Sequence, residues 1–274
     1  MLERQAAIAH TVRVYSPADW RTTMRVAVPA ILLATLASFA CQPVRAADDA
    51  ADAQKLIDRA IKAMGGSAAL EKSRNTIMED NGTYYGMGDG VPYKGRYVYS
   101  YENLGRYRME VVGIFVQVID GDKGWMSMMG NTTDIDGEAL QVMKQSWFIG
   151  YVVTLLPLQK PDKAFSLNMA KSETIDGEEC DGITVDHERM PTLTIHFSRK
   201  TGLIKKTKYV AKVAELGYQE AVEEAIFQEY TEIDGLMSVT KFVSYRDGKK
   251  FVEANFSNLR FPDTIDESEF QKPK

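Results

Sequence analysis

The stretch VEEAIFQEYTEIDGLMSVTKFVSYRDGKKFVEANFSN, residues 222–258, decides the fold class of this 274-residue chain. Three segments with alternating apolar and polar character, 222–233, 236–246 and 249–258, are separated by Ile233-Asp234-Gly235 and Arg246-Asp247-Gly248. A period of two predicts a strand, and Asp-Gly between two such segments predicts a tight hairpin turn. The stretch therefore predicts three consecutive antiparallel strands.

The same alternation of apolar and polar residues extends through most of the chain, with turn residues about every ten positions, which is typical of a meandering antiparallel sheet. Further strands are predicted near 75–86, 92–102, 105–112, 114–120, 123–129, 164–170, 172–176, 182–188, 192–198 and 203–213. No internal repeat or linker interrupts this series, so residues 47–274 are predicted to form a single domain.

Helical periodicity occurs at three places. Residues 51–64 place apolar side chains on one face and end at Gly65-Gly66, and a second short helix is predicted over 67–73. In the middle of the chain, residues 138–158 carry Leu140, Met143, Trp147, Tyr151 and Leu155 at steps of three to four, and Pro157 closes the segment. This predicts an apolar helix inserted into a β domain.

Residues 1–46 are predicted to be a secretory signal peptide with an over-extended start. Met24 is the predicted initiator, because Arg25, the apolar run 26–40 and a small-residue cleavage site after Ala46 follow it in the order that signal peptidase requires. The apolar run is shorter than the roughly 20 residues that span a bilayer. We therefore expect a periplasmic protein with no transmembrane segment.

A second interpretation of the same region stays open. Ser38-Phe39-Ala40-Cys41 loosely resembles a bacterial lipobox, and lipidation of Cys41 would anchor the protein to a membrane. Cleavage after Ala46 would instead leave Cys180 as the only cysteine, so no intramolecular disulfide is expected. Cleavage also removes five arginines and two acidic residues, which takes the net charge from −5 to −8. This acidic balance argues against nucleic acid or anionic lipid headgroups as the main partner.

The order of these elements resembles the LolA/LolB-like superfamily of bacterial envelope lipoprotein carriers, over residues of about 50 to 274. The resemblance rests on short motifs in a fixed order, namely 56–66 before the first strand, Gly121-Asp122-Lys123-Gly124-Trp125, Thr201-Gly202-Leu203, the segment 230–236 and the tail 265–273. It implies an α+β fold, mainly β, in which an incomplete antiparallel β-barrel has its concave face covered by helices. The carriers use one strand arginine to hold the lid against the barrel, and the resemblance leaves that role open among Arg96, Arg106 and Arg108.

The resemblance also implies a function. We expect a non-enzymatic envelope protein that holds an acyl chain, lipid or lipoprotein in a cavity between the curved sheet and the helix at 138–158. Aromatic and methionine side chains accept varied apolar ligands, although they also fill cores. The predicted cavity wall and lid comprise Tyr97, Tyr99, Met109, Trp125, Met128, Met143, Trp147 and Tyr151. The alternative is an envelope protein-interaction or stress-sensor module in which the same half-barrel packs a dry core.

Catalytic and metal-binding motifs do not emerge from the sequence. There is no Gly-x-Ser-x-Gly elbow and no His-Glu-x-x-His, and acidic neighbours should raise the pKa of the Cys180 thiol. His187 and His196 are too few for a typical zinc site, and Asp186-His187-Glu188 is more typical of a solvated strand end. No catalytic residue, metal or cofactor is therefore predicted.

Overall fold

The computed structural model describes residues 43–101 and 105–273. The signal-peptide prediction and the alternative at Cys41 lie outside the described residues, apart from Pro43–Ala46, which belong to the first helix. Both stay predictions.

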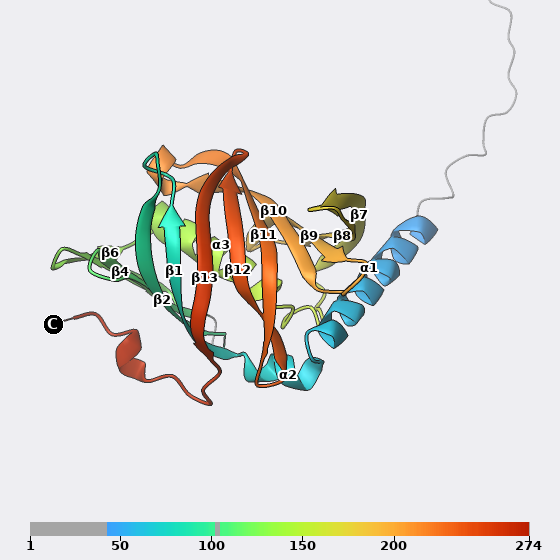
Figure 1. The fold of residues 1–274 in the computed structure, drawn as a ribbon, viewed down its shortest axis with the longest axis horizontal. Coiled ribbons are helices and arrows are strands. Elements are labelled where there is room, and N and C mark those ends of the chain that lie inside the picture. The colour runs from blue at the N-terminus through green and yellow to red at the C-terminus, as the bar shows by residue number, and fades with distance from the viewer. Residues whose placement is uncertain (1–42, 102–104, 274) are drawn as a thin grey trace, which may run out of the picture. The chain divides into compact units, whose positions relative to one another are not determined.

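Thirteen antiparallel strands form one open sheet over the described residues, in the order β6-β5-β4-β3-β2-β1-β13-β12-β11-β10-β9-β8-β7 (Figure 1). The strands are β1 Asn75–Tyr84, β2 Val91–Ser100, β3 Arg106–Val111, β4 Phe115–Asp120, β5 Lys123–Met128, β6 Asn131–Ile135, β7 Ser166–Ile175, β8 Glu178–His187, β9 Met190–Ser198, β10 Ile204–Val213, β11 Gln219–Ile233, β12 Leu236–Arg246 and β13 Lys249–Arg260. Strands β6 and β7 are the two ends of the sheet, so the barrel is incomplete. The predicted half-barrel is confirmed.

The turns between these strands follow the predicted chemistry. In the β11–β12 turn Asp234 and Gly235 have φ of 51° and 85°, and in the β12–β13 turn Asp247 and Gly248 have φ of 49° and 73°. Two consecutive positive φ angles define the type I′ hairpin turn, which matches the twist of the strands it joins. The Asp-Gly pairs thus set the register of the three strands with which the sequence analysis began.

Two strand predictions are wrong in detail. The segments 164–170 and 172–176 form one strand, β7, whose pairing with β8 shifts between Ala170 and Glu173. This irregularity breaks the period of two without ending the strand. Strand β6 was not predicted. Its Asn131 and two threonines are typical of a loop, and it is a strand because it pairs with β5.

Three helices lie in the described residues: α1 Pro43–Ala63, α2 Ser67–Lys72 and α3 Gly137–Val153. Helix α1 begins eight residues before the predicted start, and α3 ends five residues before the predicted end, since Leu155 has φ of 63° and the chain continues in turns. Between α1 and α2, Gly65 lies so close to the β11–β12 turn that a Cβ atom would stand 2.1 Å from the Gly235 carbonyl oxygen. Only glycine fits there.

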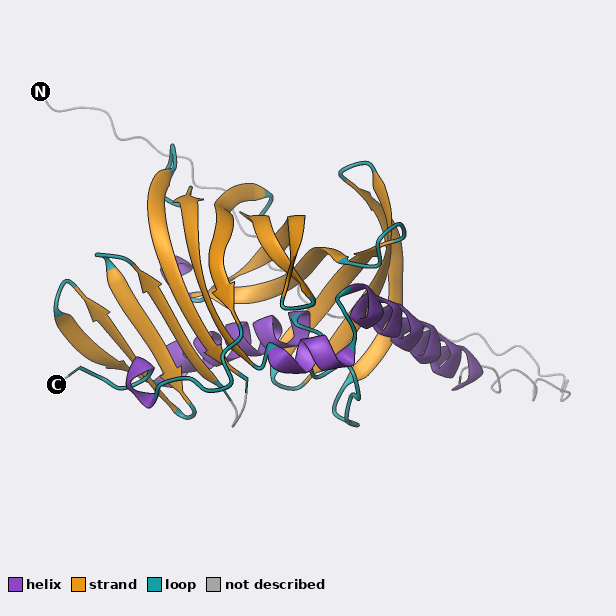
Figure 2. Cartoon of the chain, turned by 60° about the horizontal axis from the view of Figure 1, so that its bottom comes forward, coloured by secondary structure: helices purple, strands orange, loops and turns teal. Residues whose placement is uncertain are grey.

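The concave face of the sheet carries the main core. Helix α3 lies on the inner side of the curved sheet, with α1 beside β7 (Figure 2). The core joins Ile57 of α1, Leu70 of α2, Val152 of α3 and Leu193 and Ile195 of β9, all of them fully buried. Each such side chain stabilises the fold by about 1.5–3 kcal/mol relative to its exposed state.

A second core lies on the convex face of the half of the sheet that contains β1 to β5. It joins Ile77, Val98, Val118 and Trp125 to Phe270 of the C-terminal tail, residues 261–273. Phe270 is 2% exposed, and the indole Nε1 of Trp125 donates a hydrogen bond of 3.0 Å to the Phe270 carbonyl oxygen. The tail therefore closes the convex face of these strands.

Three arginines on the same convex face bind the tail. Arg96 forms two hydrogen bonds with the carboxylate of Glu269, of 2.9 and 2.5 Å, and this partner holds the pKa of Glu269 below its ordinary value. Arg106 donates to Glu267 at 2.6 Å, and Arg108 donates to the Glu269 carbonyl oxygen at 3.2 Å. The paired, two-pronged contact of Arg96 is the strongest of these by its geometry.

Candidate ligand-binding site at the end of the lid helix

A row of aromatic rings crosses from the sheet to α3, the predicted lid. Ring centroids are 5.0 Å apart for Tyr107 and Tyr99, 5.7 Å for Tyr99 and Tyr101, and 5.1 Å for Tyr101 and Tyr151, and Trp147 lies 5.8 Å from Tyr101. These separations lie within the favourable range for ring pairs. Burial raises the pKa of Tyr99, Tyr101 and Tyr107, so all three stay neutral.

The interface between α3 and the sheet is filled by the chain's own side chains. Trp147 and Phe148 are 7% and 4% exposed, Val152 and Leu155 are fully buried, and Met143 packs against the same core. Two of the residues predicted to line an open cavity, Met143 and Trp147, thus lie in a packed helix–sheet interface. Space for a ligand must therefore lie outside this interface.

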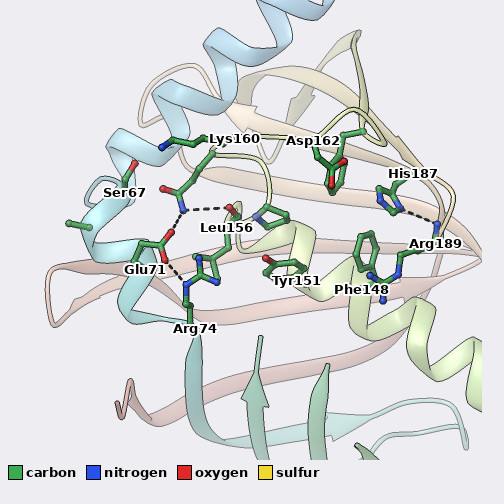
Figure 3. Close-up of a pocket in the computed structure, with 14 residues that line it drawn as sticks. Ser67, Glu71, Arg74, Phe148, Tyr151, Leu156, Lys160, Asp162, His187 and Arg189 are labelled. Atoms are coloured by element: carbon green, nitrogen blue, oxygen red, sulfur yellow. Dashed lines mark hydrogen bonds and ion pairs between the residues drawn. The ribbon is translucent and has the colours of Figure 1, made fainter. Parts of the chain in front are cut away.

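Such a space opens where α3 ends. A pocket of about 780 Å³, here called the lid pocket, lies between α2, the end of α3, the segment 156–165 and the β8–β9 turn (Figure 3). Phe148, Tyr151, Leu156 and Phe165 contribute its apolar lining. Phe148 lies 6.2 Å from Tyr151 and 6.3 Å from Phe165, ring to ring, so the aromatic row continues into the pocket.

The acidic groups of the lid pocket are already engaged. Arg74 Nε donates to Glu71 Oε2 at 2.5 Å, Gln159 Nε2 donates to Glu71 Oε1 at 3.1 Å, and the contact with Arg74 lowers the pKa of Glu71. The carboxylate of Asp162 accepts the backbone N–H of Ala164 at 2.8 Å. Both carboxylates therefore serve the local structure.

The opposite rim carries His187 and Arg189 from the β8–β9 turn. The His187 ring lies 4.7 Å from Phe148 and 4.6 Å from Phe165, and the Arg189 guanidinium lies 4.6 Å from the Phe148 ring centre. His187 Nδ1 accepts the Arg189 backbone N–H at 3.1 Å, which leaves the ring proton on Nε2. His187 is the last residue of β8 and is half-buried, so it does lie at a strand end, and its ring also contacts Phe148 and Phe165.

Comparison with solved structures identifies the architecture. A DUF1329 family protein from Desulfovibrio piger has a TM-score of 0.53 at 14% identity, covering 80% of this chain and 97% of that one. A putative outer membrane lipoprotein-sorting protein domain from Vibrio parahaemolyticus has a TM-score of 0.53 at 10% identity over 81% and 97% of the two chains. A LolA superfamily protein from Nitrosomonas europaea has a TM-score of 0.52 at 10% identity over 80% and 97%. The fold is LolA-like. No family model matches the sequence, and no curated protein matches it.

Within this LolA-like fold, the arginines do not hold the lid. Arg96, Arg106 and Arg108 all face the convex side and bind the C-terminal tail, as described above. Helix α3 is held by its apolar face, and its ion pairs among the described residues are peripheral, from Lys144 to Asp122 and from Glu138 to Lys212. Packing therefore replaces the arginine contact that the resemblance implies.

Four of the predicted cavity residues lie on the concave side of the sheet. Tyr97 and Tyr99 share that face of β2, and Met109 of β3 is the cross-strand partner of Tyr97. Met128, 42% exposed, lies at the outer end of β5 beside Met126 and Met129. None of these four lines the lid pocket. Of the eight residues predicted to form the cavity wall and lid, Tyr151 is the one that lines the lid pocket.

Trp125 is a correction to the predicted site. It pairs with Val118 and packs under Phe270, so its side chain lies on the convex face, away from the lid. The prediction treated it as a neighbour of the methionines that follow it, but adjacent residues of a strand point to opposite faces.

The sequence analysis missed Asp80, a buried acid on the concave face. It is 2% exposed and accepts the hydroxyls of Tyr93 and Tyr97 at 2.9 and 3.2 Å, and desolvation raises its pKa. Gly95 makes room for it, because a Cβ there would stand 2.2 Å from Asp80 Oδ1. The mid-strand glycine was the signal available in the sequence.

Beyond Asp80, half-buried phenylalanines extend the aromatic surface across the centre of the sheet. Phe256 lies 6.4 Å from Tyr97 and 5.4 Å from Phe242, ring to ring, and Phe242 is the cross-strand partner of Phe227. This surface lies on the same face as α3.

Other chemistry finds little support in the described part of the chain. No group of three His, Cys, Asp or Glu side chains in residues 43–101 and 105–273 could hold a metal ion. Burial, with Glu178 nearby, raises the pKa of the Cys180 thiol, which disfavours the reactive thiolate. No described helix has the length and apolar character needed to cross a membrane.

Proposed function

We propose that this protein is a non-enzymatic, periplasmic binding protein that shelters the acyl chain of a lipid or lipoprotein at the concave face of its half-barrel. The observation that carries the proposal is the aromatic row, which runs from β3 through α3 and ends in the lid pocket at Phe148 and Phe165. Aromatic side chains that line a concave site are suited to apolar chains.

Two further observations support this proposal. The lid pocket, at about 780 Å³, falls within the range of about 300–1,000 Å³ typical of small-molecule sites. One protein of similar structure is described as a putative outer membrane lipoprotein-sorting domain, and binding an acyl chain fits that role.

The location of the protein follows from its predicted signal peptide. Cleavage after Ala46 would release a freely diffusing domain, as a carrier requires, whereas lipidation of Cys41 would make it a fixed receptor. The intact mass of the exported protein distinguishes the two, because lipidation at Cys41 adds diacylglycerol and keeps residues 41–46.

The binding proposal is tested by native mass spectrometry of the exported protein, purified without detergent, followed by titration of delipidated protein with dodecanoate. We expect co-purified lipid and saturable uptake. Ala68→Trp should abolish uptake, because exposed Ala68 lines the lid pocket and an indole there fills it without removing any core side chain. Ala51→Trp, on an exposed position of α1, is the matched control and should bind normally. A lipid-free mass with no uptake overturns the proposal.

A second candidate is supported by the packed interface under α3. With Trp147, Phe148, Val152 and Leu155 all buried, the half-barrel has a dry core over this region and can serve as an envelope protein-interaction or sensor module. It predicts that dodecanoate does not bind and that Ala68→Trp has no effect on any activity of the protein. The titration above therefore separates the two candidates.

A further inference from the structure

The rim of the lid pocket carries positive charge that the local structure does not use. Arg189 lines the pocket and forms no ion pair with a carboxylate among the residues that the structure describes. Lys160 also lines it, but on the opposite side beside Glu71, whose pKa its charge helps to lower (Figure 3). Arg189 instead lies over the face of Phe148, with its guanidinium 4.6 Å from the ring centre. A guanidinium held flat on a ring keeps its N–H groups available at the edge for an acceptor.

His187 adds a donor of fixed orientation beside Arg189. Its Nδ1 accepts the Arg189 backbone N–H at 3.1 Å, and the imidazole contacts the rings of Phe148 and Phe165. The proton of the neutral ring is therefore on Nε2, which has no hydrogen-bond partner among the described residues. Figure 3 shows His187 and Arg189 on the same side of the pocket, next to Phe148, with Lys160 across from them.

The pocket's two carboxylates do not neutralise this rim. Glu71 is engaged by Arg74 and Gln159 on the other side of the pocket, and Asp162 accepts a backbone N–H. The acidic net charge of the whole chain argued against anionic headgroups, but exposed charges more than about 8 Å away are largely screened at physiological salt. The local groups decide what binds here.

We propose that the ligand of the lid pocket is an anionic amphiphile, whose carboxylate or phosphate headgroup binds Arg189 and His187 Nε2 while its chain lies on the aromatic floor. This inference rests on the proposed function and names the class of ligand. A carboxylate or phosphate forms an ion pair with the arginine in addition to hydrogen bonds from arginine and the imidazole N–H, while the same chain ending in an alcohol has no negative charge to pair with the guanidinium. Selectivity for the anion is therefore the measurable consequence.

The experiment compares three ligands with the same chain on the delipidated exported protein: dodecanoate, monododecyl phosphate and dodecanol, each titrated calorimetrically below its micelle concentration. We expect at least one of the anions to bind about ten-fold or more tightly than dodecanol. The two anions separate a carboxylate headgroup from a phosphate headgroup.

Variants assign the preference to the rim. Arg189→Gln should reduce anion affinity by about ten-fold and leave dodecanol unchanged, and Arg189→Lys should retain part of it, because the charge remains but the stacked guanidinium is lost. Lys160→Gln should have little effect, because Lys160 lies across the pocket beside Glu71. Arg199→Gln and Lys163→Gln are matched controls, since neither residue lines the pocket, and should have no effect.

The outcomes distinguish a failure of the headgroup assignment from a failure of the proposed acyl-chain binding. Equal binding of all three ligands, or an anion preference that survives Arg189→Gln, overturns the headgroup assignment and leaves the proposed function standing. Failure of all three ligands to bind overturns the proposed function itself.

Discussion

Phe270→Ala should detach the C-terminal tail from the convex face. Phe270 is 2% exposed and is the tail's one fully enclosed side chain in the second core, so its truncation removes about 3–5 kcal/mol of burial and packing. The ion pairs of Arg106 and Arg96 are partly exposed and contribute about 1 kcal/mol or less each. They cannot hold a terminal segment whose ordering costs about 1–2 kcal/mol per residue. We expect local release of the tail, with the main concave core intact.

Tryptophan placement makes the result easy to measure. Among the described residues, Trp125 packs against the tail on the convex face, and Trp147 of α3 packs into the main core on the concave face. The two indole N–H signals in a ¹⁵N spectrum therefore report the two faces of the sheet separately. In Phe270→Ala, the Trp125 indole proton should shift and lose protection from exchange, while that of Trp147 stays unchanged. Gln271→Ala, at the exposed neighbouring position, is the control. An unchanged Trp125 signal, or a shift confined to Trp147, would refute the placement of the tail.

Three further predictions concern burial and charge. Trp147→Ala should lower the free energy of unfolding by about 3–5 kcal/mol in urea denaturation, because the ring is a core residue of the lid interface, and a loss below about 1 kcal/mol would show that the site is open. Asp80 has a folded pKa above its ordinary value of about 3.9, so the wild type should lose stability as the pH rises from about 4 through the raised pKa. Asp80→Asn should lack that loss, and identical pH profiles of the two proteins would contradict the buried acid. The pKa of Glu269 shifts in the opposite direction, because Arg96 lowers it in the folded state. The stabilisation from Glu269 is therefore fully present above its unfolded pKa of about 4.3 and is lost as the pH falls through its folded pKa. Glu269→Gln should therefore hold the tail less firmly at neutral pH and show a flatter acid dependence, read from the Trp125 indole signal.

Local patterns in the sequence predict most of the sheet, because hairpin turns and alternation are set by neighbouring residues. Asp234-Gly235 and Asp247-Gly248 adopt the backbone angles that their side chains favour. Where the structure differs, a tertiary contact decides. Strand β6 forms because it pairs with β5, and β7 continues through a shift in register that is seen only in its pairing with β8.

The site was harder to predict than the fold. Alternation shows which side chains of one strand share a face, so Tyr97 and Tyr99 were correctly grouped, but it does not show which face meets the helix. Trp125 was assigned to the wrong side because it was grouped with Met128, which lies three positions along the same strand and so points to the opposite face. The lid pocket joins α2, α3 and the β8–β9 turn, which are distant in sequence, and Arg189 has no local pattern that marks it as a rim residue.

The central claim is that the lid pocket binds an acyl chain, and one titration tests it most directly. In the exported Trp125→Phe protein, the fluorescence of Trp147 reports on the end of the aromatic row, since its ring lies 5.7 Å from Tyr151 of the pocket. Adding dodecanoate to the delipidated protein should change this fluorescence saturably with one ligand per chain, and Ala68→Trp should abolish the heat of the same titration measured by calorimetry. Absence of any saturable change, with no heat of binding in the unblocked protein, would contradict the account.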